Sequence, residues 1–118
     1  MSTTNISPLT EIKGFIGACL VDSDTGLVMV SKTTGRLDME LAGAVNAEVV
    51  KAKLSAIKTL GLKEEIEDIL ITLGGQFHLI RPLAKNPTIF IYVALDRKTA
   101  NLGMARIQVK KVESDIIF

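Results

Sequence analysis

The stretch that decides the fold is residues 38–61, DMELAGAVNAEVVKAKLSAIKTLG. It contains no proline and, between Gly43 and Gly61, no further glycine, while alanine, valine, leucine, lysine and glutamate dominate it. Such a composition favours a helix, Asp38 is a favourable N-cap, and glycine is common just beyond a helix end. The stretch therefore predicts one long helix of about six turns over residues 39–60.

Strand-like segments lie on both sides of this helix. Each is a short run rich in apolar and β-branched residues and bounded by turn residues. The predicted strands are residues 15–22 and 27–32 before the helix and 66–73, 76–83 and 88–95 after it. The link Gly74-Gly75 predicts a two-residue turn of the primed type, in which both residues take positive φ. Links as short as these join antiparallel neighbours.

The chain ends are expected to add two shorter helices. Ser7-Pro8 is a typical helix start, but Gly14 ends that helix within two turns, and a last helix is predicted from about residue 99 to 113. The fold class is therefore α/β in the α+β sense, an antiparallel sheet whose faces are covered by helices. Residues 1–6 are interpreted as a polar tail and residues 7–118 as a single domain.

Composition limits the class of partner. The 118 residues are 47% apolar and the mean hydropathy is +0.34, which indicates either a large core or an apolar surface meant for a partner. A net charge of +1 and 4% aromatic residues give no support for binding nucleic acid or an anionic membrane. A single cysteine, a polar N-terminus and the lack of a long apolar run favour a cytoplasmic protein.

The long helix has two apolar arcs on a helical wheel. The broader arc is Leu41, Ala42, Val45, Val49, Ala52, Ala56 and Leu60, and the second is Met39, Val50, Leu54 and Ile57, with Gly43 beside it. A helix on a sheet needs one apolar stripe, so we expect the broader arc to cover the sheet and the second to bind a partner. A second copy of the chain is the simplest partner, and a covering loop is the alternative. The solvated side carries Glu48, Lys51 and Lys58, a candidate platform for a further protein.

The third strand supports the same interpretation. Its centre, Ile69-Leu70-Ile71, is strongly β-forming, and at a sheet edge it would be an open template for strand addition. Ile69 and Ile71 therefore join the predicted dimer interface. The alternative is a covered interior strand.

No catalytic, metal or cofactor site is predicted. Residues 22–26, DSDTG, resemble the opening of a calcium loop, but the glycine comes one position early and no glutamate follows at the required distance, so we expect a hairpin turn. His78 is the only histidine and has no cysteine or second histidine near it in the sequence. Cys19 lies in an apolar run, which is typical of a buried core thiol.

Three segments together resemble one family. They are residues 19–28, CLVDSDTGLV; residues 69–83, ILITLGGQFHLIRPL; and Leu95-Asp96-Arg97 followed by residues 100–106, ANLGMAR. Their order around one long helix resembles Roadblock/dynein light chain domains over residues 9–113. The first helix is shorter here than is usual in that family.

The resemblance implies a five-stranded sheet with the long helix on one face and the short N-terminal and C-terminal helices on the other. It also implies a homodimer formed through the long helix and the third strand, with no enzymatic activity and no cofactor. Family members of the bacterial type regulate or scaffold small Ras-like GTPases, and such a GTPase is the expected partner. The alternatives are an assembly adaptor, like dynein light chains, without contact to a GTPase, and a small-molecule sensor.

Overall fold

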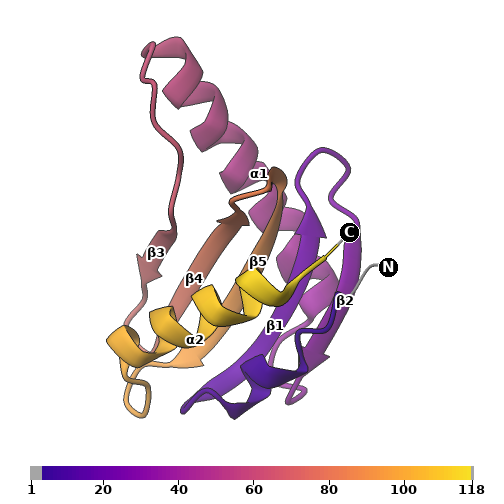
Figure 1. The fold of residues 1–118 in the computed structure, drawn as a ribbon. Coiled ribbons are helices and arrows are strands. Elements are labelled where there is room, and N and C mark those ends of the chain that lie inside the picture. Colours follow the sequence, from indigo (N-terminus) through magenta and orange to yellow (C-terminus); the bar gives the residue numbers. More distant parts are fainter. Residues whose placement is uncertain (1–3, 118) are drawn as a thin grey trace.

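The computed structural model describes residues 4–117. Along the chain, a short 3₁₀ turn and a hairpin precede the long helix, and three strands and a second helix follow it (Figure 1). The elements are η1 (Ser7–Glu11), β1 (Phe15–Asp22), β2 (Val28–Thr33), α1 (Met39–Thr59), β3 (Ile69–Thr72), β4 (Gln76–Leu83), β5 (Asn86–Asp96) and α2 (Leu102–Asp115). The predicted order of elements is confirmed.

The five strands form one antiparallel sheet in the order β2-β1-β5-β4-β3. The central strands β1 and β5 are buried along nearly their whole length, which explains why their sequences are continuously apolar rather than alternating. β2 and β3 are the two edges of the sheet. A register shift between Leu20 and Val21 disturbs the pairing of β1 with β2, a common feature of edge strands.

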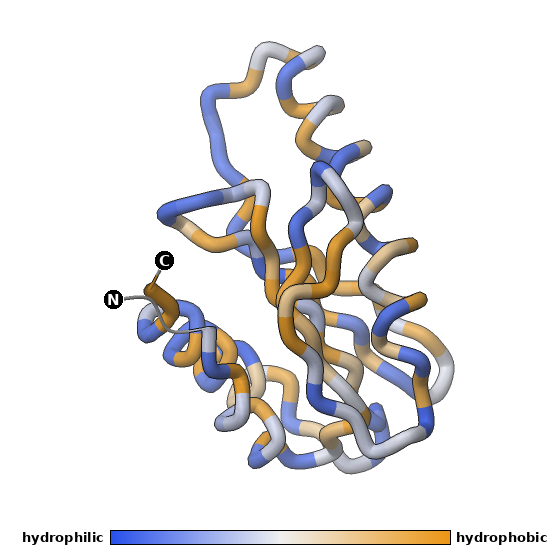
Figure 2. The backbone as a smooth tube through the Cα atoms, turned by 90° about the vertical axis from the view of Figure 1, so that its right-hand side faces the viewer, coloured by the Kyte–Doolittle hydropathy of each residue, from blue (hydrophilic) through white to orange (hydrophobic). Residues whose placement is uncertain are grey.

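The molecule has three layers, with α1 on one face of the sheet and η1 and α2 on the other (Figure 2). Alternation along β5 divides its side chains between two cores. Ile91, Val93 and Leu95 pack under α2, whereas Phe90, Tyr92 and Ala94 pack under α1. The predicted arrangement of helices about the sheet is therefore confirmed.

Both ends of α1 follow the sequence signals. The Asp38 side chain accepts a hydrogen bond from the Leu41 N–H at 3.2 Å. At the other end Gly61 takes φ +67°, and the N–H groups of Gly61 and Leu62 donate to the carbonyls of Lys58 and Ile57. This is a Schellman motif, and only glycine adopts its left-handed residue without strain.

Some details differ from the expectation. β3 is four residues long, because the charged segment before Ile69 forms no ladder. Neither Gly74 nor Gly75 takes the positive φ that a primed turn requires, although the Leu73 N–H does donate to the Gln76 carbonyl across that turn. The predicted tail also reaches the core, since Ile6 is fully buried beneath α2; residues 1–3 of that tail lie outside the described residues.

Candidate interaction surface

The two arcs of α1 face opposite to our expectation: the second arc faces the sheet, and the broader arc is largely exposed. Met39 and Val50 are buried against the sheet within one protomer, so they cannot form a dimer interface. Gly43 is buried as well, and a Cβ atom there would lie 2.6 Å from Cγ2 of Val28 and 3.0 Å from Cγ2 of Val21. The absent side chain of Gly43 is therefore what lets α1 approach the sheet closely.

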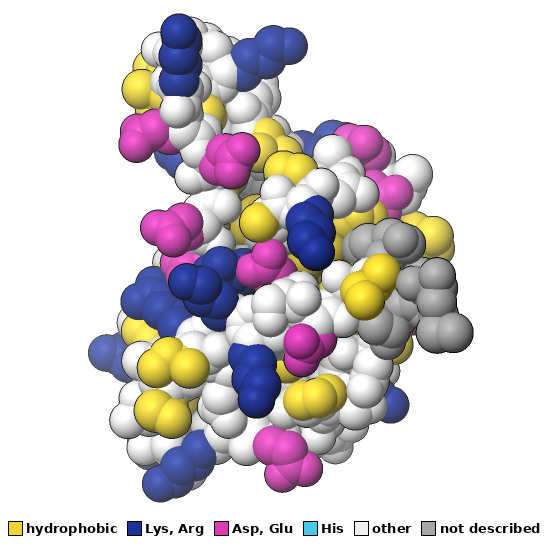
Figure 3. All heavy atoms as spheres, in the orientation of Figure 1, with side chains coloured by type: hydrophobic (Ala, Val, Ile, Leu, Met, Phe, Trp, Pro, Cys, Tyr) yellow, Lys and Arg dark blue, Asp and Glu magenta, His cyan; other side chains and the backbone are white. Residues whose placement is uncertain are grey.

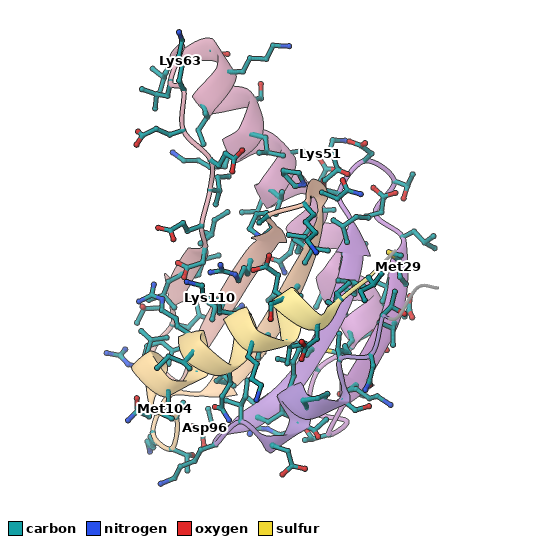
Figure 4. The ribbon with its side chains drawn as sticks, viewed as in Figure 1. Met29, Lys51, Lys63, Asp96, Met104 and Lys110 are labelled. Atoms are coloured by element: carbon teal, nitrogen blue, oxygen red, sulfur yellow. The ribbon has the colours of Figure 1, made fainter. Side chains whose placement is uncertain are left out.

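Leu54 and Ile57 are half-buried in the protomer. Leu54 packs on the core beneath α1, and both residues line a hollow of about 140 Å³ that also borders Ile66 and Pro87. Here α1 has passed the end of the sheet, and Lys63 lies at the tip of this overhang (Figures 1 and 4). The assignment of Leu54 and Ile57 to a dimer interface is therefore not supported by their positions.

The other arc, which we expected on the sheet, is largely exposed. Its larger members are Leu41 (61% exposed), Val45 (54%), Val49 (38%) and Leu60 (67%). Leu41, Val45, Val49 and the exposed Ala52 recur every three or four positions and form one stripe along α1, and Leu60 lies on the same side about two turns further on. We call Leu41, Val45, Val49, Ala52 and Leu60 the apolar stripe; within the described protomer no element covers it.

The apolar stripe adjoins the free edge of the sheet. A groove of about 590 Å³ is lined by Val49, Ala52 and Lys53 of α1 and by Asp68 and Ile69 at the start of β3. Asp68 also accepts two hydrogen bonds from Arg106 of α2, at 3.0 and 3.2 Å, which hold the entry to β3 in place. An apolar helix face and an unpaired strand edge therefore form one continuous surface.

The predicted residues Ile69 and Ile71 belong to this surface. In the register of β3 with β4 they lie opposite Ile80 and His78, so they are on the face of the sheet that carries α1. Both are half-buried in the protomer. The expectation that the third strand lies at an edge is confirmed, while the role of these residues in a dimer stays a prediction.

His78 is held by two hydrogen bonds on the same face. Its Nδ1 lies 3.1 Å from the hydroxyl of Tyr92 and its Nε2 lies 2.7 Å from Oε1 of Gln76. The rings of His78 and Tyr92 meet edge to face, with centroids 5.4 Å apart. His78 therefore lies on the opposite face of the sheet from its neighbours Phe77 and Leu79, which pack on the α2 side.

The candidate platform is exposed. Glu48, Lys51 and Lys58 are all exposed, and Glu48 and Lys51 form an ion pair of 3.8 Å. Figure 4 shows Lys51 on the outer side of α1. A solvated ion pair at this distance contributes little to stability. These charges therefore remain free to contact another molecule, which is the role the sequence suggested.

Two buried groups with reactive side chains are held in their neutral form. Burial, with a smaller effect of Glu40, raises the pKa of Cys19 to about 12, and burial raises the pKa of Tyr92 to about 12. Between residues 4 and 117 no three His, Cys, Asp or Glu side chains gather in a way that could hold a metal ion. The residues once compared with a calcium loop form a hairpin turn, in which the Gly26 N–H donates to the Asp22 carbonyl at 2.8 Å.

The face of the sheet covered by α2 is a weaker candidate for a functional site. A hollow of about 650 Å³ lies between the β4–β5 turn and the end of α2, but Glu113, an acid that lines it, is engaged by Arg81 at 2.5 Å and by the Ala84 N–H at 2.9 Å. On this side hydrophobic side chains are scattered among charged ones (Figure 3). In the part of the chain that the structure describes, no helix is long and apolar enough to cross a membrane.

No protein-family model matches the sequence, and no curated protein matches it. Solved structures do match the fold. MglB of Myxococcus xanthus superposes with a TM-score of 0.78 at 20% identity, covering 91% of this chain and 84% of that one. A Roadblock/LC7 domain from Streptomyces avermitilis gives 0.77 at 12% identity, over 91% of this chain and 86% of that one.

The chain has the Roadblock/LC7 fold. A further structure, described as MglB with a tetrameric arrangement, gives a TM-score of 0.73 at 14% identity over 95% of this chain and 89% of that one. At these identities the likeness concerns the fold. It agrees with the resemblance found in three segments of the sequence.

Proposed function

We propose that this chain is a non-enzymatic Roadblock-family protein that forms a homodimer and regulates or scaffolds a small Ras-like GTPase. One observation supports the proposed homodimer: the apolar stripe of α1 is exposed and continuous with the free edge of β3. The family resemblance in the sequence, together with the Roadblock/LC7 fold shared with MglB, supports the class of partner.

A second copy is the occupant that fits this surface best. Burying a side chain such as Leu41 or Val45 contributes roughly 1.5–3 kcal/mol of transfer free energy, and a two-fold dimer buries each residue twice. Two β3 edges that pair would also satisfy the unpaired backbone groups of both strands and join two sheets into one. The proposed interface is therefore the apolar stripe with Ile69 and Ile71, in place of the buried Met39, Gly43 and Val50.

The proposed GTPase contact uses the outer side of α1. On the helical wheel Lys51 and Lys58 lie away from the apolar stripe, so dimer formation leaves them accessible, whereas Glu48 lies beside Leu41 at the border of the stripe. Exposed charges of this kind suit polar, reversible contacts. Since α1 contains no arginine, any stimulation of GTP hydrolysis would act by repositioning the GTPase's own residues rather than through an arginine finger from this helix.

The experiment is a titration of the dimer with a Ras-like GTPase from the same genome, in its GDP state and in its GTP-analogue state. We expect binding that depends on the nucleotide, weakened about tenfold or more in the double variant Lys51→Glu/Lys58→Glu. The matched control is Lys13→Glu/Lys85→Glu, which changes the net charge equally at exposed positions outside α1 and should bind normally. Single replacement of the exposed Arg36 or Arg97 should leave any stimulation nearly intact.

Absence of binding in both nucleotide states would contradict the GTPase proposal and leave an assembly adaptor as the function. A small-molecule sensor has no specific observation in its favour, because the hollow beside α2 is lined by an acid that is already engaged by Arg81.

A further inference from the structure

The half of the sheet that α1 leaves uncovered includes the only histidine of the chain. Within the protomer α1 packs mainly on β1 and β2, whereas β3 and the neighbouring part of β4 extend beyond it. Ile69, Ile71 and His78 lie on this part of the sheet, and His78 pairs directly with Ile71 of the edge strand. A second copy that buries the apolar stripe and the β3 edge would therefore also cover His78.

The hydrogen bonds of His78 define one neutral form of its ring. Oε1 of Gln76 can only accept, so the Nε2 atom, 2.7 Å away, must donate its hydrogen. In a neutral ring Nδ1 then accepts, and its partner at 3.1 Å is the Tyr92 hydroxyl, which donates. Both ring nitrogens are satisfied in this neutral form.

Protonation would disturb this arrangement. A hydrogen on Nδ1 would point at the phenol oxygen, and the hydroxyl hydrogen of Tyr92 would have to turn toward another acceptor. Tyr92 is 1% exposed, so water does not readily provide that acceptor. The polar side chain beside the hydroxyl is that of Asn46, whose amide N–H group already donates to the Ala42 carbonyl at 2.8 Å. A charged imidazole would also lie half-buried against apolar neighbours, which is unfavourable unless the charge is paired.

The neighbours of His78 that the structure describes offer no charge to compensate for this cost. The residues opposite His78 are Ile71 on β3 and Ala94 on β5, both uncharged. The charged residues lining the adjacent groove are Lys53, a cation, and Asp68, which is already paired with Arg106. Burial is the cause that lowers the pKa of His78 below its ordinary value of 6.5.

We propose that His78 is a proton-sensitive contact of the homodimer: two copies associate while both imidazoles are neutral and separate as the imidazoles take up protons. This rests on the homodimer of the proposed function. Covering His78 with a second copy removes more water from the ring and disfavours its charged form further. Dissociation is then coupled to proton uptake at two symmetric sites, so acid weakens the dimer.

The experiment measures the dissociation constant of the native chain by sedimentation across the range from about pH 7.5 to about pH 5, with circular dichroism to confirm that the fold persists. We expect the dissociation constant to rise about tenfold or more over this range, because each protomer takes up a proton as the dimer separates. In His78→Gln, whose neutral amide can still accept from Tyr92, the dissociation constant should stay nearly constant.

A second measurement does not depend on a variant. Because the chain has one histidine, its ring resonance in a proton NMR spectrum is unambiguous, and its pKa can be followed at concentrations above and below the dissociation constant. We expect a lower pKa in the dimer than in the monomer.

The results of these experiments separate a failure of the proposed role of His78 from a failure of the proposed homodimer. A dimer whose dissociation constant is independent of pH, or varies equally in His78→Gln, overturns the role of His78 and leaves the homodimer intact. Equal pKa values in monomer and dimer overturn it too. A chain that stays monomeric at about pH 7.5 contradicts the proposed function itself, and the role of His78 with it.

Discussion

At the scale of single residues, Gly43 fixes how closely α1 lies against the sheet. Replacing it with alanine adds one methyl group 2.6 Å from Val28, and overpacking of this kind lowers the free energy of unfolding by about 1–3 kcal/mol. Helix propensity alone would change the free energy of unfolding in the opposite direction, because it favours alanine over glycine by about 1 kcal/mol. Urea unfolding followed by circular dichroism measures the difference.

The matched control for this prediction is Gly103→Ala on α2. A Cβ atom there has only Oδ1 of Asn101 near it, at 3.6 Å, so the substitution should leave stability unchanged or raise it by less than about 1 kcal/mol. Equal effects of the two substitutions would show that the close approach at Gly43 is not a constraint.

At the scale of elements, the Arg81–Glu113 pair fastens β4 to α2. The two side chains are 14% and 10% exposed, and Glu113 also accepts from the Ala84 N–H. Burial opposes ionisation of Glu113, but the Ala84 N–H and Arg81 outweigh it and hold its pKa below the ordinary 4.5. The stability that this carboxylate contributes is therefore fully present above pH 4.5 and is lost as the pH falls through the lowered pKa.

We expect Glu113→Gln to lower the free energy of unfolding by about 1–3 kcal/mol at neutral pH, because Arg81 loses its partner. The difference from the native chain should shrink in strong acid, where Glu113 is protonated. Asp115→Asn, an exposed change on the same helix, is the control and should have little effect. A difference that persists undiminished well below pH 4.5 would contradict this assignment.

The elements themselves could be predicted from the sequence, because their signals are local. Asp38 and Gly61 bound α1 as expected, and β4 has the predicted residues. β3 was predicted too long, since the β-forming Ile66 lies among four acids, and one of these, Asp68, pairs with α2 instead of joining the ladder. That pairing joins residues far apart in the chain and has no local signal.

The direction in which α1 faces could not be predicted from periodicity, because both of its arcs are apolar. Only the shape of the sheet decides between them, and that shape depends on all five strands. The signal that could have decided it is Gly43: a glycine inside a helix is costly and is retained where the backbone must approach something closely. Within one chain the nearest such surface is the sheet, so the arc beside Gly43 is the inward one.

At the scale of the whole molecule, the proposed function requires a homodimer in which the apolar stripe and the β3 edge of one copy meet those of another. The stripe is exposed in the protomer, so a charge introduced there should prevent association without disturbing the fold. Val45→Glu makes this change, and Ser55→Glu places the same charge on the solvated side of α1 as its control.

Sedimentation equilibrium of the native chain, at about neutral pH and at micromolar concentration, tests this most directly. We expect a mass twice the 12.7 kDa of one chain, a shift to the single mass in Val45→Glu, and an unchanged dimer in Ser55→Glu. A native chain that sediments at 12.7 kDa even at high micromolar concentration, or a dimer that Val45→Glu leaves intact, would contradict it.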